Sequence, residues 1–117
     1  MRATVPAFVS VACFMLVTAC GGDAEPAAPC ADPEPANAVT LADFEFQPAC
    51  IGVVSGSTIA LENTGAAPHT FTMDGTDVDV DLPAGGSGQA SLEGIEIGAY
   101  ALTCTYHPQM TGTVVVG

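Results

Sequence analysis

Positive charge is almost missing from this chain of 117 residues, which contains one arginine, Arg2, and no lysine. Its 13 Asp and Glu residues give it a formal net charge of −12 at pH 7. Nucleic-acid phosphates repel such a chain, which excludes nucleic acid as a partner. The acidic field either steers a basic partner or serves solubility alone, and the sequence does not choose between these roles.

Histidine is nearly as scarce, with His69 and His107 as the two in the chain. Two imidazoles do not supply the several metal centres of a multicopper oxidase or a copper nitrite reductase, which argues against an enzyme. No helical period of useful length follows residue 20, and the segment Asp74 to Asp81 lacks the glycine position and the terminal glutamate of an EF-hand. The chemistry of this chain therefore depends on few residues.

Those few residues form a recognisable pattern. Cys104, His107 and Met110 follow one another at intervals of three, which suits a tight loop around one point, because a strand would alternate their faces. His69 begins a β-like run further upstream. One thiolate, two imidazoles and one thioether are the ligand set of a blue-copper site, which tolerates both Cu(I) and Cu(II). Taken one at a time, these residues are more often core or surface residues, so only their combination predicts a copper ion.

The segment Tyr100 to Val116, YALTCTYHPQMTGTVVV, resembles the C-terminal copper loop and last strand of cupredoxins, with the short spacing of amicyanin-like members. Upstream, Phe44 to Pro48 and the run STIALENTGAAPHTFTM resemble the family's earlier strands up to its first histidine ligand. The resemblance covers roughly residues 38 to 117. It implies His69, Cys104 and His107 as equatorial ligands and Met110 as the axial ligand.

The chain departs from the family pattern at two positions. Thr70 stands where many cupredoxins have an Asn that fixes the ligand loop, and Tyr106 stands where Pro often precedes the second histidine. A threonine hydroxyl still donates a hydrogen bond, with a shorter reach. We expect Thr70 to lie next to the ligands and these changes to tune the spectrum and the potential rather than to abolish binding.

The N-terminus predicts export. Residues 1–19 carry Arg2 and then a short apolar stretch, which fits the core of a signal peptide better than a membrane span. The residues around Cys20 resemble a bacterial lipobox, so Cys20 is expected to be acylated and to anchor the protein at the membrane surface. Ordinary secretory cleavage or an uncleaved anchor are the alternatives, and each of these still exports the domain.

Residues 20–37 are rich in Gly, Ala, Pro and acid and read as a linker that cannot fold alone. Of five cysteines, Cys13 lies in the signal segment, Cys20 is assigned to lipid and Cys104 to metal, which leaves Cys30 and Cys50. In an oxidising compartment this pair is expected to form a disulfide, with two free thiols as the alternative.

Residues 38–117 have the sequence pattern of β-strands throughout. This pattern predicts an all-β Greek-key sandwich or barrel of about seven to eight strands. The strands are expected at 39–46, 51–54, 58–62, 70–73, 78–82, 88–92, 99–103 and 111–116. Alternation predicts the following core residues: Phe44, Phe46, Ile59, Leu61, Phe71, Tyr100, Leu102, Val114 and Val116.

Together these features favour a monomeric, exported one-electron carrier with one copper ion that serves redox proteins at the outer face of a membrane. Copper capture, storage or delivery would use the same ligands and is the main alternative. An exported β-sandwich that acts only as an adhesive or scaffold domain would make the four-ligand pattern accidental.

Overall fold

The computed structural model describes residues 30–117, which form ten β-strands. Within this range there is no helix long and apolar enough to cross a membrane. The strands are β1 (Glu34–Pro35), β2 (Ala38–Ala42), β3 (Glu45–Gln47), β4 (Cys50–Val53), β5 (Thr58–Asn63), β6 (His69–Met73), β7 (Asp79–Leu82), β8 (Ser87–Ser91), β9 (Gly98–Thr103) and β10 (Thr111–Val116).

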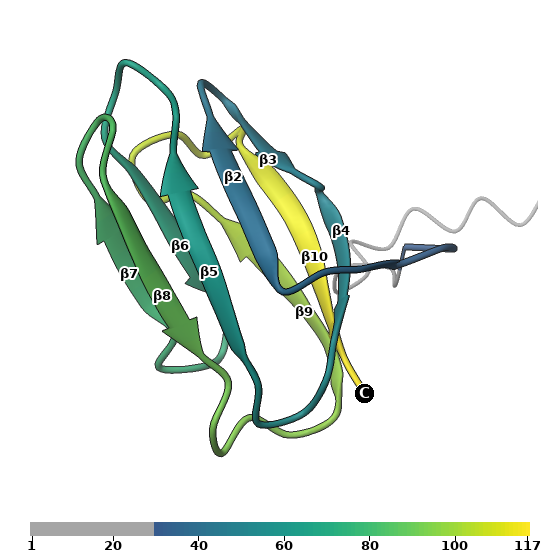
Figure 1. Ribbon diagram of the computed structural model, residues 1–117. Helices are drawn as coiled ribbons and strands as arrows, with labels where there is room; N and C mark the ends of the chain where they lie inside the picture. The colour runs from purple at the N-terminus through teal and green to yellow at the C-terminus, as the bar shows by residue number, and fades with distance from the viewer. Residues whose placement is uncertain (1–29) are drawn as a thin grey trace, which may run out of the picture.

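The strands make two sheets that pack face to face as a β-sandwich (Figure 1). One sheet has the order β1-β4-β10-β9-β6-β7 and the other has the order β3-β2-β5-β8. Three pairings are parallel, namely β1 with β4, β4 with β10 and β2 with β5, and the remaining pairings are antiparallel. The fold class predicted from the sequence, an all-β sandwich, is confirmed, with slightly more strands than expected.

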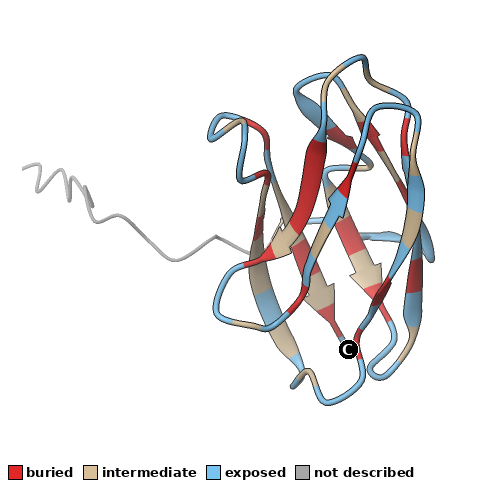
Figure 2. Ribbon diagram, turned by 90° about the vertical axis from the view of Figure 1, so that its left-hand side faces the viewer, coloured by how far each residue is buried: buried red, intermediate tan, exposed pale blue. Residues whose placement is uncertain are grey.

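The core lies between the two sheets, because each strand alternates between inward and outward side chains. In β5 the inward positions are Ile59, Leu61 and Asn63, and the residues between them are exposed. Buried residues alternate with exposed or intermediate ones in β2, β3 and β4 too, whereas β6 is buried at four of its five positions; Figure 2 shows the buried segments along the strands. The largest fully buried apolar side chains are Phe46, Phe71, Leu41, Ile51, Ile59, Met73, Leu92, Leu102 and Met110.

The prediction of one strand over residues 39–46 is wrong, because Asp43 and Phe44 form a turn that separates β2 from β3. Val39 and Leu41 point inward at odd positions, whereas the next buried residue, Phe46, is at an even position. A continuous strand cannot bury both sets on one face, so the change of phase requires a turn. Phe44 was expected in the core and is instead 54% exposed.

The N-terminal end of the described chain packs along β4. Cys30 and Cys50 form a disulfide with a Cα–Cα distance of 6.0 Å, and β1 pairs with Ile51 and Gly52. Part of the segment that the sequence assigned to the linker therefore lies against the sheet. The predicted signal peptide at 1–19 and the predicted lipidation site, Cys20, lie outside the described residues.

We expect removal of the disulfide to lower the stability of the apoprotein. By the chain-entropy model, the Cys30→Ser/Cys50→Ser double variant loses about 3 kcal/mol in the free energy of unfolding, because the bridge closes a loop across a sequence separation of 20 residues. Urea denaturation of both proteins measures the difference. Equal unfolding midpoints, or two free thiols in the mass spectrum of the unreduced protein, would contradict the prediction.

Candidate metal centre

Strand pairing brings the predicted ligands to one end of the sandwich, the end opposite the C-terminus (Figure 1). His69 is the first residue of β6, Cys104 directly follows β9, and Met110 directly precedes β10. Because β6 and β9 are antiparallel neighbours with Thr72 opposite Thr103, the start of β6 lies beside the chain that leaves β9. Residues 35 positions apart in the sequence therefore meet.

Three strong ligand atoms converge there. The Sγ atom of Cys104 lies 3.8 Å from Nδ1 of His69 and 3.6 Å from Nδ1 of His107. The ligand atoms of the three residues all lie within 4.8 Å of one another. His69 and Cys104 are buried, whereas His107 is partly exposed, so the cluster opens toward solvent only on the His107 side.

The loop between Cys104 and Met110 is closed by its own backbone. Cys104 N donates to Met110 O at 3.2 Å, His107 N donates to Cys104 O at 3.3 Å, and Met110 N donates to His107 O at 2.8 Å. These bonds fold the segment into two successive turns on the β9–β10 hairpin. The side chain of Met110 is fully buried beneath the loop, and His107 lies at its outer surface.

Thr70 contacts the ligand loop in two ways. Its backbone N–H donates to Cys104 Sγ at 3.4 Å, a contact that stabilises a thiolate and that any residue except proline could make. Its hydroxyl oxygen accepts from Thr105 N at 2.8 Å and therefore anchors the loop just after the cysteine. The hydroxyls of Thr70 and Thr72 are also 2.9 Å apart, which extends the polar contact along β6.

Asn63 holds the segment that precedes His69, a role that the sequence did not indicate. Its buried side-chain amide donates to the carbonyl oxygens of Ala67 at 2.9 Å and of Leu82 and Pro83 at 3.1 Å. Its Oδ1 atom accepts from Gly65 N at 2.9 Å. One side chain therefore joins the β5–β6 loop to the end of β7.

Asp43 is the second residue that sequence reasoning missed. Its carboxylate Oδ1 lies 3.1 Å from Nε2 of His69, on the side of the ring that faces away from Cys104. A hydrogen bond from Ala66 N, followed by the bond from His69, holds the pKa of Asp43 below its ordinary value. The change of phase between Leu41 and Phe46 was the signal that could have placed Asp43 in a turn.

Tyr106, the other departure from the family pattern, points away from the cluster. It is 49% exposed, and its hydroxyl donates to the carboxylate of Asp81 on β7. This hydrogen bond, together with the negative charge of Asp81, raises the pKa of Tyr106 above its ordinary value. The contact ties the outer part of the ligand loop to the edge strand of the larger sheet.

The donor set fits a metal ion in size and in chemistry. A metal bonded to nitrogen at about 2.0 Å and to sulfur at about 2.3 Å, with angles between tetrahedral and trigonal, holds these two atoms roughly 3.5 to 3.7 Å apart. The two S···N separations at Cys104, 3.6 and 3.8 Å, are close to that range. One thiolate with two imidazoles is the donor set of trigonal copper centres.

Comparison with known proteins agrees with this geometry. A family model described as a cupredoxin-like domain matches residues 7–116. The chain belongs to the cupredoxin-like family. Amicyanin-alpha from Methylorubrum extorquens is 35% identical over 82 residues, which cover 67% of this chain and 69% of that protein.

Solved structures extend the likeness to the fold. The Cu(I) form of an amicyanin variant has a TM-score of 0.58 at 25% identity and is covered over 95% of its length by 82% of this chain. A purple cupredoxin from Nitrosopumilus maritimus has a TM-score of 0.57 at 19% identity, with 98% of its chain and 68% of this one covered. A copper-containing nitrite reductase from Thermus scotoductus shares the fold over 25% of its own length and 80% of this chain (TM-score 0.59, 21% identity).

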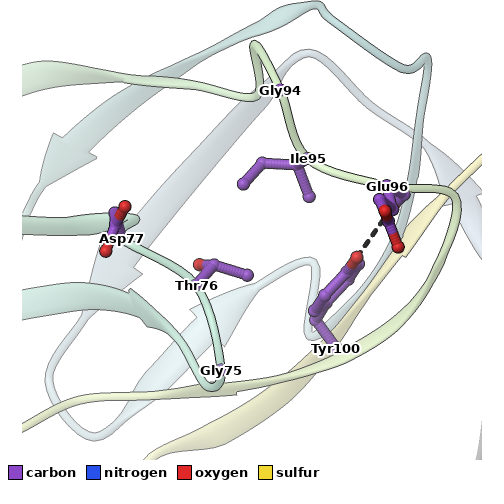
Figure 3. Close-up of a pocket in the computed structure, with 7 residues that line it drawn as sticks. All are labelled: Gly75, Thr76, Asp77, Gly94, Ile95, Glu96 and Tyr100. Atoms are coloured by element: carbon purple, nitrogen blue, oxygen red, sulfur yellow. Dashed lines mark hydrogen bonds between the residues drawn. The ribbon is translucent and has the colours of Figure 1, made fainter.

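A hollow of about 340 Å³ lies at the other end of the sandwich, between the β6–β7 turn and the β8–β9 connection. Thr76, Asp77 and Glu96 supply its polar groups, and the hydroxyl of Tyr100 donates to the main-chain oxygen of Glu96 at 2.7 Å (Figure 3). Its lining contains neither an imidazole nor a thiol. The metal-binding chemistry of the described residues is therefore concentrated at the Cys104 end.

We expect Asn63→Ala to reduce the stability of the apoprotein by about 3 kcal/mol, because three carbonyl groups lose a buried donor and a cavity remains. Urea denaturation followed by circular dichroism measures this loss. Asn37→Ala is the matched control, since Asn37 is exposed and its replacement should change stability by less than about 0.5 kcal/mol. Equal effects of the two substitutions would show that the side-chain amide of Asn63 does not organise the loop.

Proposed function

We propose that this protein is a one-electron carrier that uses a single copper ion. His69, Cys104 and His107 are the proposed equatorial ligands, and Met110 is the proposed axial ligand. When bound, copper supplies the change between Cu(I) and Cu(II). The residues of the chain supply a mixed sulfur and nitrogen environment that suits both states, so little rearrangement accompanies electron transfer.

The observation that carries this proposal is the convergence of one thiol and two imidazoles, whose donor atoms all lie within 4.8 Å of one another. Cys104 receives a backbone hydrogen bond from Thr70, and its loop is closed by three further backbone bonds. A site whose ligands are held by the hydrogen bonds of the chain itself needs little reorganisation when its charge changes.

Burial of the ligands favours electron transfer over catalysis. His69, Cys104 and Met110 are all buried, so a substrate has no access from their side of the cluster. His107 is the partly exposed ligand, and we assign its outer ring edge as the route for electrons. The exposed residues Phe44, Pro68 and Pro108 form an apolar rim that suits brief docking of a redox partner.

The relatives are consistent with this assignment. Solved structures of amicyanin variants include a Cu(I) form and an oxidised form. Because the full chain carries a formal net charge of −12, the proposed partners are redox proteins with a basic docking surface. We further propose that the protein works as an exported monomer that is anchored by lipid on Cys20 at the outer face of a membrane.

The optical spectrum tests the copper site. Addition of Cu(II) to the apoprotein should produce intense visible absorption from charge transfer between the Cys104 thiolate and copper, and Cys104→Ser should abolish it. The Cys30→Ser/Cys50→Ser variant is the matched control, because it removes two sulfur atoms that do not belong to the cluster and should keep the absorption. A colourless complex in the unmodified protein would refute the proposed function.

Electron exchange separates a carrier from a copper-delivery protein. NMR line broadening in mixtures of reduced and oxidised protein should show rapid electron self-exchange, while copper stays bound in the presence of a competing chelator for hours. Delivery predicts the reverse pattern, with ready loss of copper and slow exchange. The burial of His69, Cys104 and Met110 is the reason to expect retention of the metal.

A further inference from the structure

The turn between β2 and β3, formed by Asp43 and Phe44, contacts the ring of His69 on the side opposite Cys104. Nδ1 of His69 faces Cys104 Sγ at 3.8 Å, and Nε2 of the same ring faces Asp43 Oδ1 at 3.1 Å. The imidazole is fully buried, whereas the side chain of Asp43 is 39% exposed. The ring is therefore held between a thiol on one side and a carboxylate on the other.

The carboxylate itself is held in place by a second loop. Ala66 N donates to both oxygen atoms of Asp43 at 3.1 Å, and Ala67 N donates to Oδ1 at 3.4 Å. Gly65 makes room for this arrangement, because a Cβ atom at that position would lie 2.8 Å from His69 Nε2 and 3.0 Å from Asp43 Cγ. The β5–β6 loop is thus shaped around the contact between Asp43 and His69.

The backbone of the turn is strained in a way that fits a functional role. Phe44 has a φ of 69°, a left-handed conformation that a bulky residue rarely adopts. Such strain persists where the surroundings compensate for it, and it is common next to binding sites. The ring of Phe44 lies edge-on to His107, with 5.0 Å between the centroids, so adjacent residues of one turn contact both imidazoles.

We propose that Asp43 is a positioning residue for the metal, one that holds the proton of His69 on Nε2 and stabilises Cu(II) relative to Cu(I). With that proton fixed, the lone pair on Nδ1 is free to bind metal. A negative charge one ring away from the metal favours the more positive oxidation state. This inference rests on the proposed function for its redox effect, but the position of the proton does not depend on copper.

The charge is tested by Asp43→Asn, which keeps an oxygen in the place of Oδ1 and removes the charge. We expect the ratio of Cu(II) to Cu(I) affinity to fall about tenfold, seen in voltammetry as a rise of about 59 mV in the reduction potential. Glu45→Gln is the matched control on the same hairpin, since it removes one exposed charge that does not contact histidine. The ratio of Cu(II) to Cu(I) affinity in this variant should change by less than about threefold, because water and salt screen the charge of Glu45.

The hydrogen bond is tested without copper. In ¹⁵N-edited NMR of the apoprotein at mildly alkaline pH, His69 should carry its proton on Nε2 in the unmodified chain and in Asp43→Asn. In Asp43→Ala the ring should lose this preference and show both tautomers. Because the spectrum of the unmodified apoprotein already tests the assignment, the proposal can be refuted even if neither variant folds.

The outcomes separate this proposal from the function on which it rests. Equal shifts of potential in Asp43→Asn and Glu45→Gln, or a proton on Nδ1 in the apoprotein, would overturn the role of Asp43 while the carrier function stands. If the unmodified protein forms no coloured copper complex but His69 carries its proton on Nε2, the carrier function fails and the positioning of the imidazole by Asp43 is supported.

Discussion

The antiparallel register between β6 and β9 is the constraint on which the metal centre depends. Thr72 lies opposite Thr103, and continuation of that register places Thr70 beside Thr105, where the hydroxyl of one and the backbone of the other are hydrogen-bonded. A shift of one residue would reverse the face of every side chain on β6 and turn His69 away from the cysteine. The two sheets fix this register because they bury Phe71 and Leu102 between them.

Polar side chains at the ends of strands also hold the segment that contains His69. Asn63 joins the β5–β6 loop to the end of β7, and Asp43 joins the β2–β3 turn to the same loop. Both residues act on the segment that leads into His69. His69 is therefore held by its own strand, by the loop before it and by the β2–β3 turn, which contacts Nε2 of its ring.

Family membership and geometry agree on the kind of centre. The chain belongs to the cupredoxin-like family and is similar to an amicyanin, and its structure brings together the side chains of His69, Cys104 and His107. At the two positions where this chain departs from the family pattern, the side chains make hydrogen bonds to neighbouring elements. Thr70 anchors the ligand loop through its hydroxyl, and Tyr106 binds Asp81 on the neighbouring edge strand.

The sequence by itself determined the fold class, most strand positions and the ligand types, because alternation and the spacing of Cys104, His107 and Met110 are local properties of the chain. Although the change of phase between Leu41 and Phe46 carried the signal for the break between β2 and β3, the sequence did not determine the exposure of Phe44 or the roles of Asp43 and Asn63. These depend on contacts between residues about 20 to 26 positions apart, which arise only when the two sheets pack. Tertiary structure alone decided which carboxylate of this acidic chain faces a histidine, since no local pattern distinguishes Asp43 from the other exposed acids.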